Sequence, residues 1–436
     1  MRLLRSIRPA LQPVRLKMKV LIVTYYWPPS GGGGVQRWLK FATCLDKMGH
    51  DVVVYTPENP DAPIIDASLE LEIPDGIKVI KKPIFEPSRF AASLTKKGGN
   101  GRTGASGGGD KRSVASKLAH WVRGNFFVPD ARVRWVKPSV KFLIKWLSEN
   151  QVDAIVTTGP PHSMHLIGLG LKKSNPQLKW ISDFRDPWSD MDYLSEFKMG
   201  SRAVKKMLRY ERAVAENSDH LIVTSKGASV KLLEHTDTEC SVIPNGWDPV
   251  DFPESITKNQ KGDVLRIGHF GSLHGSRNAR GVWAALEKLS KEGRAFELIL
   301  AGTVSAEIRQ ELESSSFSEK CVFMDSLPHK TSIEEMVKCD ALLLVHNDTE
   351  SATKSTPGKL FEYIATAKPI ISICRKEGDL AQRLSEINLP FAEHDNAEKA
   401  YEIITQFEAQ TSVDAGPFTR MALTEKLEGI LNRITQ

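Results

Sequence analysis

The 436-residue sequence lacks both a cysteine framework and a long apolar run. Its five cysteines are scattered and form no CxxC pair. This disfavours a zinc site or a disulfide-rich secreted fold, and it favours a reducing compartment. No apolar run approaches the roughly 18 residues of a transmembrane helix. We therefore expect a cytoplasmic protein that does not span a membrane.

Most of the chain also lacks an excess of charge of either sign. The formal net charge is +6, but residues 1–17 carry five basic side chains and no acid, so the remainder is nearly neutral. This distribution argues against a nucleic-acid partner. Residues 1–17 have neither the apolar core nor the cleavage site of a signal peptide. We interpret them as a disordered basic leader or a consequence of start-codon choice, because Met18 directly precedes the first predicted strand.

A second basic stretch runs from Arg89 to Arg123. Its centre, at about residues 95–113, is glycine-rich and predicts a disordered insert. The sequence that follows, KLAHWVRGNFFVPDARVRW, mixes aromatic residues with arginines. This composition fits a contact with the anionic inner face of a membrane. It also fits a contact with a polyanionic acceptor. It fits equally well a solvated loop followed by a core helix.

Short apolar runs alternate with amphipathic segments along the chain, the pattern of parallel α/β sheets. A stretch rich in Pro, Asn, Gly and Asp, 244–263, separates two such series and predicts an interdomain connection. The predicted strands are 19–26, 51–57, 153–159, 180–184, 220–225 and 240–244, and then 265–271, 296–302, 321–327, 341–347 and 369–374.

We therefore predict an α/β protein with two facing Rossmann-like domains and the active site in the cleft between them. The first domain would span residues 18–250 and the second residues 262–415. A final helix within 416–436 could cross back to the first domain.

The loop WPPSGGGGVQRW follows the first predicted strand and leads into a helix. Gly32 and Gly33 would let backbone amides approach an anionic ligand, and the helix N-terminus adds partial positive charge. The dinucleotide fingerprint GxGxxG fails here because Gln36 holds the place of its third glycine, which disfavours NAD. A plain flexible turn is the alternative interpretation.

The segment FGSLHGSRNARGVW follows the first strand of the second domain. A diphosphate at this turn would meet the backbone of Gly271 and the guanidinium of Arg277. Arginines at helix starts are also common on protein surfaces, so this segment by itself does not establish a site.

The segment STPGKLFEYIATAKPII places Gly358 and Lys359 at a predicted helix start, with Glu362 one turn later. A carboxylate there can accept hydrogen bonds from two ribose hydroxyls. In the alternative interpretation, Lys359 and Glu362 form a solvated pair that contributes little.

The sequence resembles the retaining nucleotide-sugar glycosyltransferases of the GT-B fold, the family 4 group, from Met18 to the C-terminus. The segments that carry the resemblance are, in order, KVLIVTYYWPPSGGGGVQR, TTGPPHSMHLIGL, DFRDPW, VIPNGWD, HFGSLHGSRNARG and PGKLFEYIATAKPII. The resemblance implies transfer of a sugar from a nucleotide-diphosphate sugar to a glycan or lipid-linked acceptor, with retention of configuration, in surface polysaccharide or glycolipid synthesis. It specifies neither the donor nor the acceptor.

The resemblance also implies roles in donor binding. Glu362 would hold the donor ribose, and Arg277 and Lys359 would neutralise the diphosphate. The same motif places Gly358 and Leu360 beside the donor. The family often has a second glutamate eight positions upstream of the ribose glutamate, where this chain has Lys354.

The family places a histidine near the transferring sugar, after a strand in the middle of the first domain. We prefer His162, which lies just past the strand, over His165, which falls one turn into the helix and would support it. Asp183, Arg185 and Asp186 follow the next strand, and one of them would contact acceptor hydroxyls. Asp183 could instead be structural.

No metal or cofactor is expected. Asp190 and Asp192 spell DxD, a pattern of metal-dependent transferases of another fold, but they lie in a polar stretch rather than at the end of a buried strand. Two rival functions are a sugar-nucleotide epimerase of the same architecture and a non-catalytic nucleotide-sugar-binding subunit. The presence of His162 and Lys359 argues against the second rival.

Overall fold

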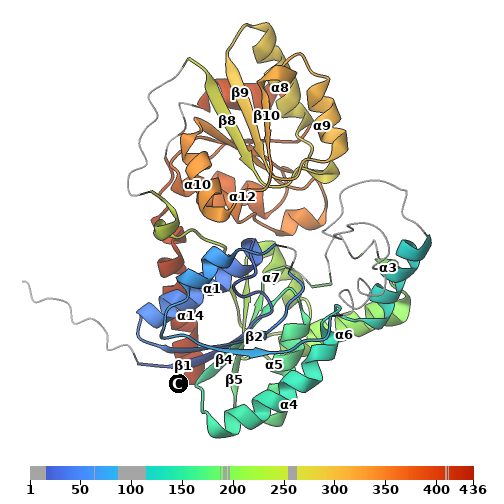
Figure 1. Cartoon of the computed structure of the whole chain (residues 1–436), viewed down its shortest axis with the longest axis vertical. Helices are drawn as coiled ribbons and strands as arrows, with labels where there is room; N and C mark the ends of the chain where they lie inside the picture. Colours follow the sequence, from blue (N-terminus) through green and yellow to red (C-terminus); the bar gives the residue numbers. More distant parts are fainter. Residues whose placement is uncertain are drawn as a thin grey trace, which may run out of the picture.

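The computed structural model contains two parallel sheets, each with helices on both faces, in two domains that lie one above the other in Figure 1. It describes residues 16–62, 64–86, 114–186, 188, 189, 194, 197–253, 263–407, 410 and 412–436. The predicted leader up to residue 15, the glycine-rich insert, Asp190 and Asp192 lie outside the described residues. No helix in these ranges is long and apolar enough to cross a membrane.

The first domain is built on a seven-stranded sheet in the order β3-β2-β1-β4-β5-β6-β7, with all neighbours parallel. Its inner strands are almost wholly buried because helices cover both faces. The strands are β1 (Lys19–Val23), β2 (Asp51–Pro57), β3 (Lys78–Lys82), β4 (Ala154–Gly159), β5 (Lys179–Phe184), β6 (His220–Val223) and β7 (Cys240–Val242).

Two groups of helices cover this sheet. On one face, α1 (Gly33–Lys47) packs with the last helix, α14 (Arg420–Thr435), so the end of the chain belongs to the core of the first domain. The helices on the other face are α4 (Val133–Glu149), α5 (Ser163–Ser174), α6 (Ser201–Asn217) and α7 (Lys226–Leu233). A further helix, α3 (Val114–Phe126), lies beside α6.

The second domain is built on a six-stranded parallel sheet in the order β10-β9-β8-β11-β12-β13. Its strands are β8 (Leu265–Phe270), β9 (Phe296–Ala301), β10 (Cys321–Met324), β11 (Ala341–Val345), β12 (Ile370–Ile373) and β13 (Phe391–Ala392). One face is covered by α8 (Arg280–Lys291), α9 (Ala306–Glu313) and α13 (Ala397–Thr405). The other face is covered by α10 (His329–Lys338), α11 (Lys359–Ala365) and α12 (Asp379–Glu386).

The predicted fold class, two Rossmann-like domains, is confirmed. Two strands that the sequence did not predict, β3 and β13, lie at sheet edges. β3 has the sequence KVIKK, and its lysines break the apolar pattern because an edge strand is only partly covered. β13 is two residues long and carries too little pattern to be recognised.

The two chain segments that connect the domains also bond to each other. The segment that follows β7 carries Trp247, whose Nε1 donates to the carbonyl of Ala415 on the return segment (2.8 Å). The amide of Arg420, at the start of α14, donates to the carbonyl of Trp247 (2.8 Å). The chain segment that leaves the first domain and the segment that comes back to it are therefore hydrogen-bonded to each other.

The carboxyl ends of the two sheets face each other. Ser225, after β6, donates from Oγ to the carbonyl of Lys354, after β11 (2.6 Å). The amide of Gly227 donates to Oδ2 of Asp379, after β12 (2.7 Å). A side chain at Gly227 would begin 2.9 Å from the Lys354 Cα, so this approach requires glycine.

The strand order reverses between β1 and β4 in the first sheet and between β8 and β11 in the second. In doubly wound sheets, ligands bind at the carboxyl ends of the strands beside such a reversal. A ligand site is therefore expected at the loops that follow these four strands.

Candidate active site

The glycine loop after β1 leaves the N-terminus of α1 open. Gly32 has a φ of 85°, a conformation that favours glycine, and no side chain caps the helix. Gly32 and Gly33 are exposed, and nothing lies within 4 Å of where a Gly33 side chain would begin. The backbone amides here can therefore be approached closely.

The loop after β4 carries the two predicted histidines, and both are buried. The His162 ring stacks on Trp188 with centroids 5.0 Å apart, and His165 stacks on Phe184 at 4.6 Å. Burial, with His165 and then Arg185 nearby, holds the pKa of His162 well below its usual range. Burial and Arg185 lower the pKa of His165 to about 3. Both imidazoles are therefore neutral near pH 7.

The ring nitrogens of these histidines are incompletely bonded. His165 Nδ1 bonds Thr157 Oγ1 (2.8 Å), whereas its Nε2 and both nitrogens of His162 have no hydrogen-bond partner among the described residues. Buried polar atoms of this kind usually have partners. His162 therefore keeps hydrogen-bonding capacity at the carboxyl end of β4.

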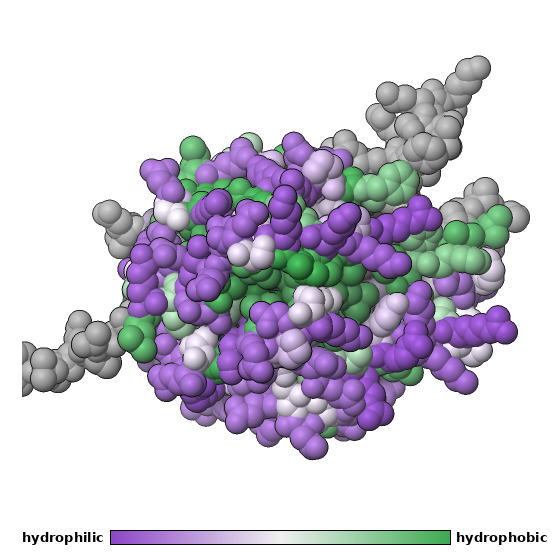
Figure 2. Space-filling view, turned by 90° about the horizontal axis from the view of Figure 1, so that it is seen from below, coloured by the Kyte–Doolittle hydropathy of each residue, from purple (hydrophilic) through white to green (hydrophobic). Residues whose placement is uncertain are grey.

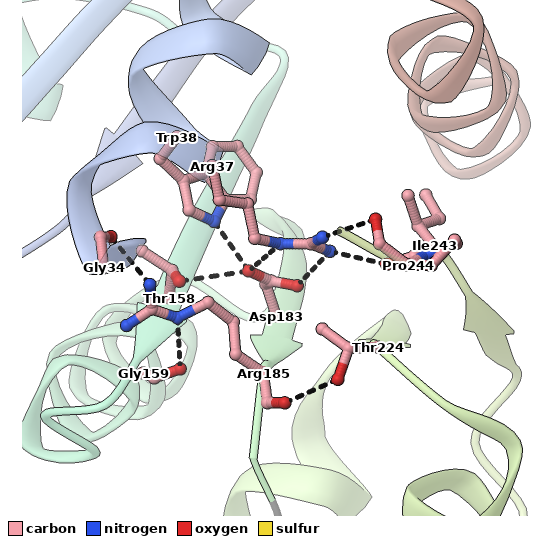
Figure 3. Close-up of polar contacts among 10 residues, drawn as sticks. All are labelled: Gly34, Arg37, Trp38, Thr158, Gly159, Asp183, Arg185, Thr224, Ile243 and Pro244. Carbon is pink, nitrogen blue, oxygen red and sulfur yellow. Dashed lines mark hydrogen bonds and ion pairs between the residues drawn. The ribbon is translucent and has the colours of Figure 1, made fainter. Parts of the chain in front are cut away.

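Arg185, after β5, holds the loops after β1 and β4 together. Its Nη1 donates to the carbonyl of Gly34 (2.7 Å), its Nε to that of Gly159 (3.0 Å) and its Nη2 to that of Pro160 (2.9 Å). Figure 3 shows the guanidinium between Gly34 and Gly159. These contacts give Arg185 a positioning role, and its predicted contact with an acceptor stays a prediction.

The next candidate, Asp186, is half-buried, and burial raises its pKa.

Asp183, at the end of β5, lies in a buried ion-pair network (Figure 3). Its carboxylate accepts from Arg37 Nη2 (2.9 Å) and Nε (3.1 Å), from Trp38 Nε1 (2.6 Å) and from Thr158 Oγ1 (3.0 Å). With both oxygens bonded to groups of α1 and β4, these contacts favour the structural alternative for Asp183.

The same network holds the start of the interdomain connection. Arg37 also donates to the carbonyls of Ile243 (2.9 Å) and Pro244 (2.9 Å), as Figure 3 shows. One turn further along α1, the buried Lys40 forms ion pairs with three carboxylates. They are those of Glu72 (3.0 Å), Asp248 (3.2 Å) and Asp251 (2.6 Å).

In the second domain, Arg277 spans the reversal between β8 and β11. It lies in a short turn after β8, and its Nε donates to the side-chain oxygen of Asn347, which follows β11. Burial lowers the pKa of His269, beside Gly271, to about 4, and Arg277 and Lys359 both contribute to that shift. The two predicted diphosphate-binding cations are therefore both near enough to this imidazole to disfavour its charged form.

At the start of α11, Glu362 is held between two basic side chains. Lys359 Nζ lies 2.7 Å from one carboxylate oxygen, and His329 Nε2, at the start of α10, lies 3.3 Å from the other. Burial alone would raise the pKa of Glu362, but Lys359 and His329 outweigh it and lower the pKa to about 2. Glu362 therefore stays ionised near pH 7.

The other two residues predicted on this motif differ in accessibility. Gly358 is half-buried, and a side chain there would begin 3.5 Å from the Asn245 side chain, beside the interdomain connection. Leu360 is fully buried, so only its backbone could face a ligand. The hydroxyl of Tyr363 accepts from the amide of Phe270 (3.0 Å) and fixes α11 against β8.

Sequence reasoning missed two polar groups in this region, His329 and Asn347. They lie 33 and 70 residues from their respective partners, Glu362 and Arg277. No local pattern could have revealed either contact. The described residues contain no group of three or more His, Cys, Asp or Glu side chains arranged to hold a metal ion.

No protein-family model matches the chain, and no curated protein matches it. Solved structures match it over nearly their full lengths. The glycosyltransferase from Rickettsia africae ESF-5 is 14% identical with a TM-score of 0.59, covering 96% of this chain and 99% of that one. Anabaena HepE, solved in complex with UDP and glucose, is 16% identical with a TM-score of 0.59, covering 95% and 100%.

A putative UDP-N-acetylglucosamine 2-epimerase from Listeria monocytogenes is also similar, at 12% identity and a TM-score of 0.55 over 94% of this chain and 95% of that one. At these identities the likeness establishes the architecture alone. The chain has the GT-B architecture of two facing Rossmann-like domains, which transferases and the epimerase share.

Replacing Asp183 tests its structural role. Asp183→Ala leaves the Arg37 guanidinium buried without its counter-charge, so the free energy of unfolding should fall by about 3–5 kcal/mol. Urea denaturation followed by tryptophan fluorescence measures the change. Glu313→Ala, which breaks an exposed pair with Arg309 on α9, is the control and should cost less than about 1 kcal/mol. Equal effects of the two substitutions would contradict the structural role.

Proposed function

We propose that the protein is a retaining glycosyltransferase that moves a sugar from a nucleotide-diphosphate sugar to a glycan or lipid-linked acceptor, in surface polysaccharide or glycolipid synthesis. The observation that carries the proposal is the grouping of Glu362, Lys359 and Arg277 at the carboxyl ends of β8 and β11, opposite the first domain. The GT-B architecture supports it, as does the similarity to HepE, which was solved with UDP and glucose.

In this proposal Glu362 accepts hydrogen bonds from the ribose hydroxyls. The carboxylate is already ionised and oriented by His329, so it needs no reorganisation to bind them. Lys359 has a flexible side chain that is 33% exposed. It can therefore turn from Glu362 towards the donor diphosphate.

Negative charge grows on the diphosphate as the bond to the sugar breaks. Arg277 and Lys359 stabilise this charge and so lower the barrier to breaking the bond. Two cations at the leaving group leave no required role for a divalent ion. The acceptor hydroxyl attacks from the face that the nucleotide leaves, and Asp186 is our candidate for its contact.

Removing the Glu362 carboxylate should weaken donor binding. Loss of two hydrogen bonds to a charged acceptor is expected to cost about 2–4 kcal/mol in the affinity for UDP. Isothermal titration with UDP measures it. Glu402→Ala is a matched control, because Glu402 forms the same i,i+3 pair with Lys399 on α13. Equal affinities of Glu362→Ala and the wild type would remove Glu362 from the site.

Activity should survive chelation, because the leaving group is neutralised by Arg277 and Lys359 rather than by a metal. Donor turnover is measured with and without excess EDTA, over a panel of nucleotide sugars. Unchanged rates are expected. Complete loss, restored by magnesium or manganese, would contradict the proposal and direct attention to Asp190 and Asp192.

His162 is proposed to support positive charge at the anomeric carbon through a neutral ring nitrogen or its carbonyl. His162→Ala should therefore lower kcat by about 100- to 1000-fold with little change in donor affinity, because the contact matters mainly in the transition state. His165→Ala controls for the loss of a buried ring in the same cluster and should retain most of kcat.

NMR of the anomeric proton in the product tests the stereochemistry, and the configuration of the donor should be kept. An inverted product would overturn the assignment of a retaining mechanism. A fully active His162→Ala variant would transfer the role to His165 or Asp186.

A sugar-nucleotide epimerase is the second candidate, favoured by the architecture shared with the Listeria protein. An epimerase releases free nucleotide without an acceptor, so product analysis with and without acceptor separates the two activities. A chain that binds UDP-sugars but yields no product under either condition would be a binding subunit.

A further inference from the structure

Three neighbouring helices of the first domain carry a large excess of positive charge. Together α3, α4 and α6 contain eleven lysines and arginines and three glutamates. This excess is larger than the net charge of +6 of the whole chain. α4 and α6 lie on either side of α5, and α3 adjoins α6, so the charge is concentrated on one side of the domain.

The outer face of α4 is a basic stripe. Arg134, Lys137, Lys141 and Lys145 recur at spacings of three and four residues, which places them on one side of the helix, and all four are exposed. None of the four forms an ion pair with another described residue. Ile144, 42% exposed, lies beside them.

The outer face of α6 combines cations with apolar side chains. Arg202, Lys205 and Arg209 are exposed, and Val204 and Leu208 lie among them. The carboxylate of Glu211 is turned into the protein, where it accepts from the amide of Ser189 (3.1 Å). No acidic residue precedes Glu211 in α6, so its first half is purely basic in charge.

α3 presents apolar side chains to solvent while its other face is anchored. Leu118, Trp121 and Phe126 are exposed by 59%, 44% and 66%, and the Trp121 and Phe126 rings lie 5.9 Å apart. Figure 2 shows hydrophobic residues at the right-hand end of the molecule, where α3 lies in Figure 1. This arrangement differs from that of a core helix, whose apolar face would be buried.

α3 is anchored to the segment that precedes α6. A side chain at Gly124 would begin 2.5 Å from the Phe197 Cβ, and the Arg123 guanidinium lies 5.3 Å from the Phe197 ring centroid. Asn125 Oδ1 accepts from the amide of Gly200, just before α6 (2.7 Å). Leu118, Trp121 and Phe126 remain exposed beside these contacts.

We propose that this surface, formed by α3 with the outer faces of α4 and α6, docks the first domain on an anionic lipid bilayer. Trp121, Phe126 and Leu118 would enter the interface between headgroups and acyl chains, and the surrounding cations would meet anionic headgroups. A soluble polyanion would need the cations but would gain nothing from exposed apolar side chains. The docking does not depend on the proposed glycosyl transfer, so an experiment can contradict one proposal without contradicting the other.

Flotation of the full chain with vesicles tests the proposal. The protein should float with phosphatidylcholine vesicles that contain phosphatidylglycerol at low salt, and not with phosphatidylcholine alone. The Trp121→Ala, Phe126→Ala double variant should lose about tenfold in partition coefficient, because two inserted rings are removed. Lys137→Gln, Lys141→Gln should bind more weakly and with less dependence on salt.

The control is Leu71→Ala, Val250→Ala, which removes two exposed apolar side chains outside this surface and should float like the wild type. Circular dichroism should be the same for all variants, because every substituted side chain is exposed. A wild type that does not float with anionic vesicles would overturn the proposal. So would unchanged flotation of the aromatic variant, which would indicate a purely electrostatic contact of the kind a polyanion makes.

Discussion

The arrangement of the first domain depends on one buried ion pair, between Arg37 and Asp183. Both side chains are fully inaccessible, and the pair is tolerable because every guanidinium nitrogen and both carboxylate oxygens are hydrogen-bonded within the protein. Arg37 has donors left after binding Asp183, and they reach the carbonyls of Ile243 and Pro244. A single guanidinium thus joins α1, the end of β5 and the start of the interdomain connection.

The candidate site takes its shape from this constraint. With the connection fixed to α1 and paired to the return segment, the carboxyl ends of the two sheets face each other. Arg185 uses a second, partly buried guanidinium to fix the loops after β1 and β4. On the opposite side, Arg277 and Lys359 remain accessible enough to meet an anion, and Glu362 stays ionised between two bases. Arg37 and Arg185 therefore spend their hydrogen bonds on the structure, whereas Arg277 and Lys359 are available to a ligand.

The same domain combines two surfaces of different chemistry. The loops at the carboxyl end of its sheet carry exposed glycine backbone at the start of α1 and two buried, neutral imidazoles after β4. Its α3–α4–α6 side is basic and partly apolar, which suits an anionic lipid surface. A transferase that acts on a lipid-linked acceptor would need both on the acceptor-binding domain.

The sequence by itself determined the two sheets, because buried parallel strands are continuous apolar runs that local pattern reveals, and it singled out Glu362, Lys359 and Arg277 through short motifs. It could not predict β3, whose lysines interrupt the apolar run, or β13, which is only two residues long. Only the tertiary structure decided that Arg185 binds carbonyls of two distant loops and that His329 and Asn347 contact Glu362 and Arg277. It also turned the aromatic side chains of α3 outward. These outcomes rest on contacts between residues far apart in the chain, and the geometry of such contacts exists only once both sheets have formed.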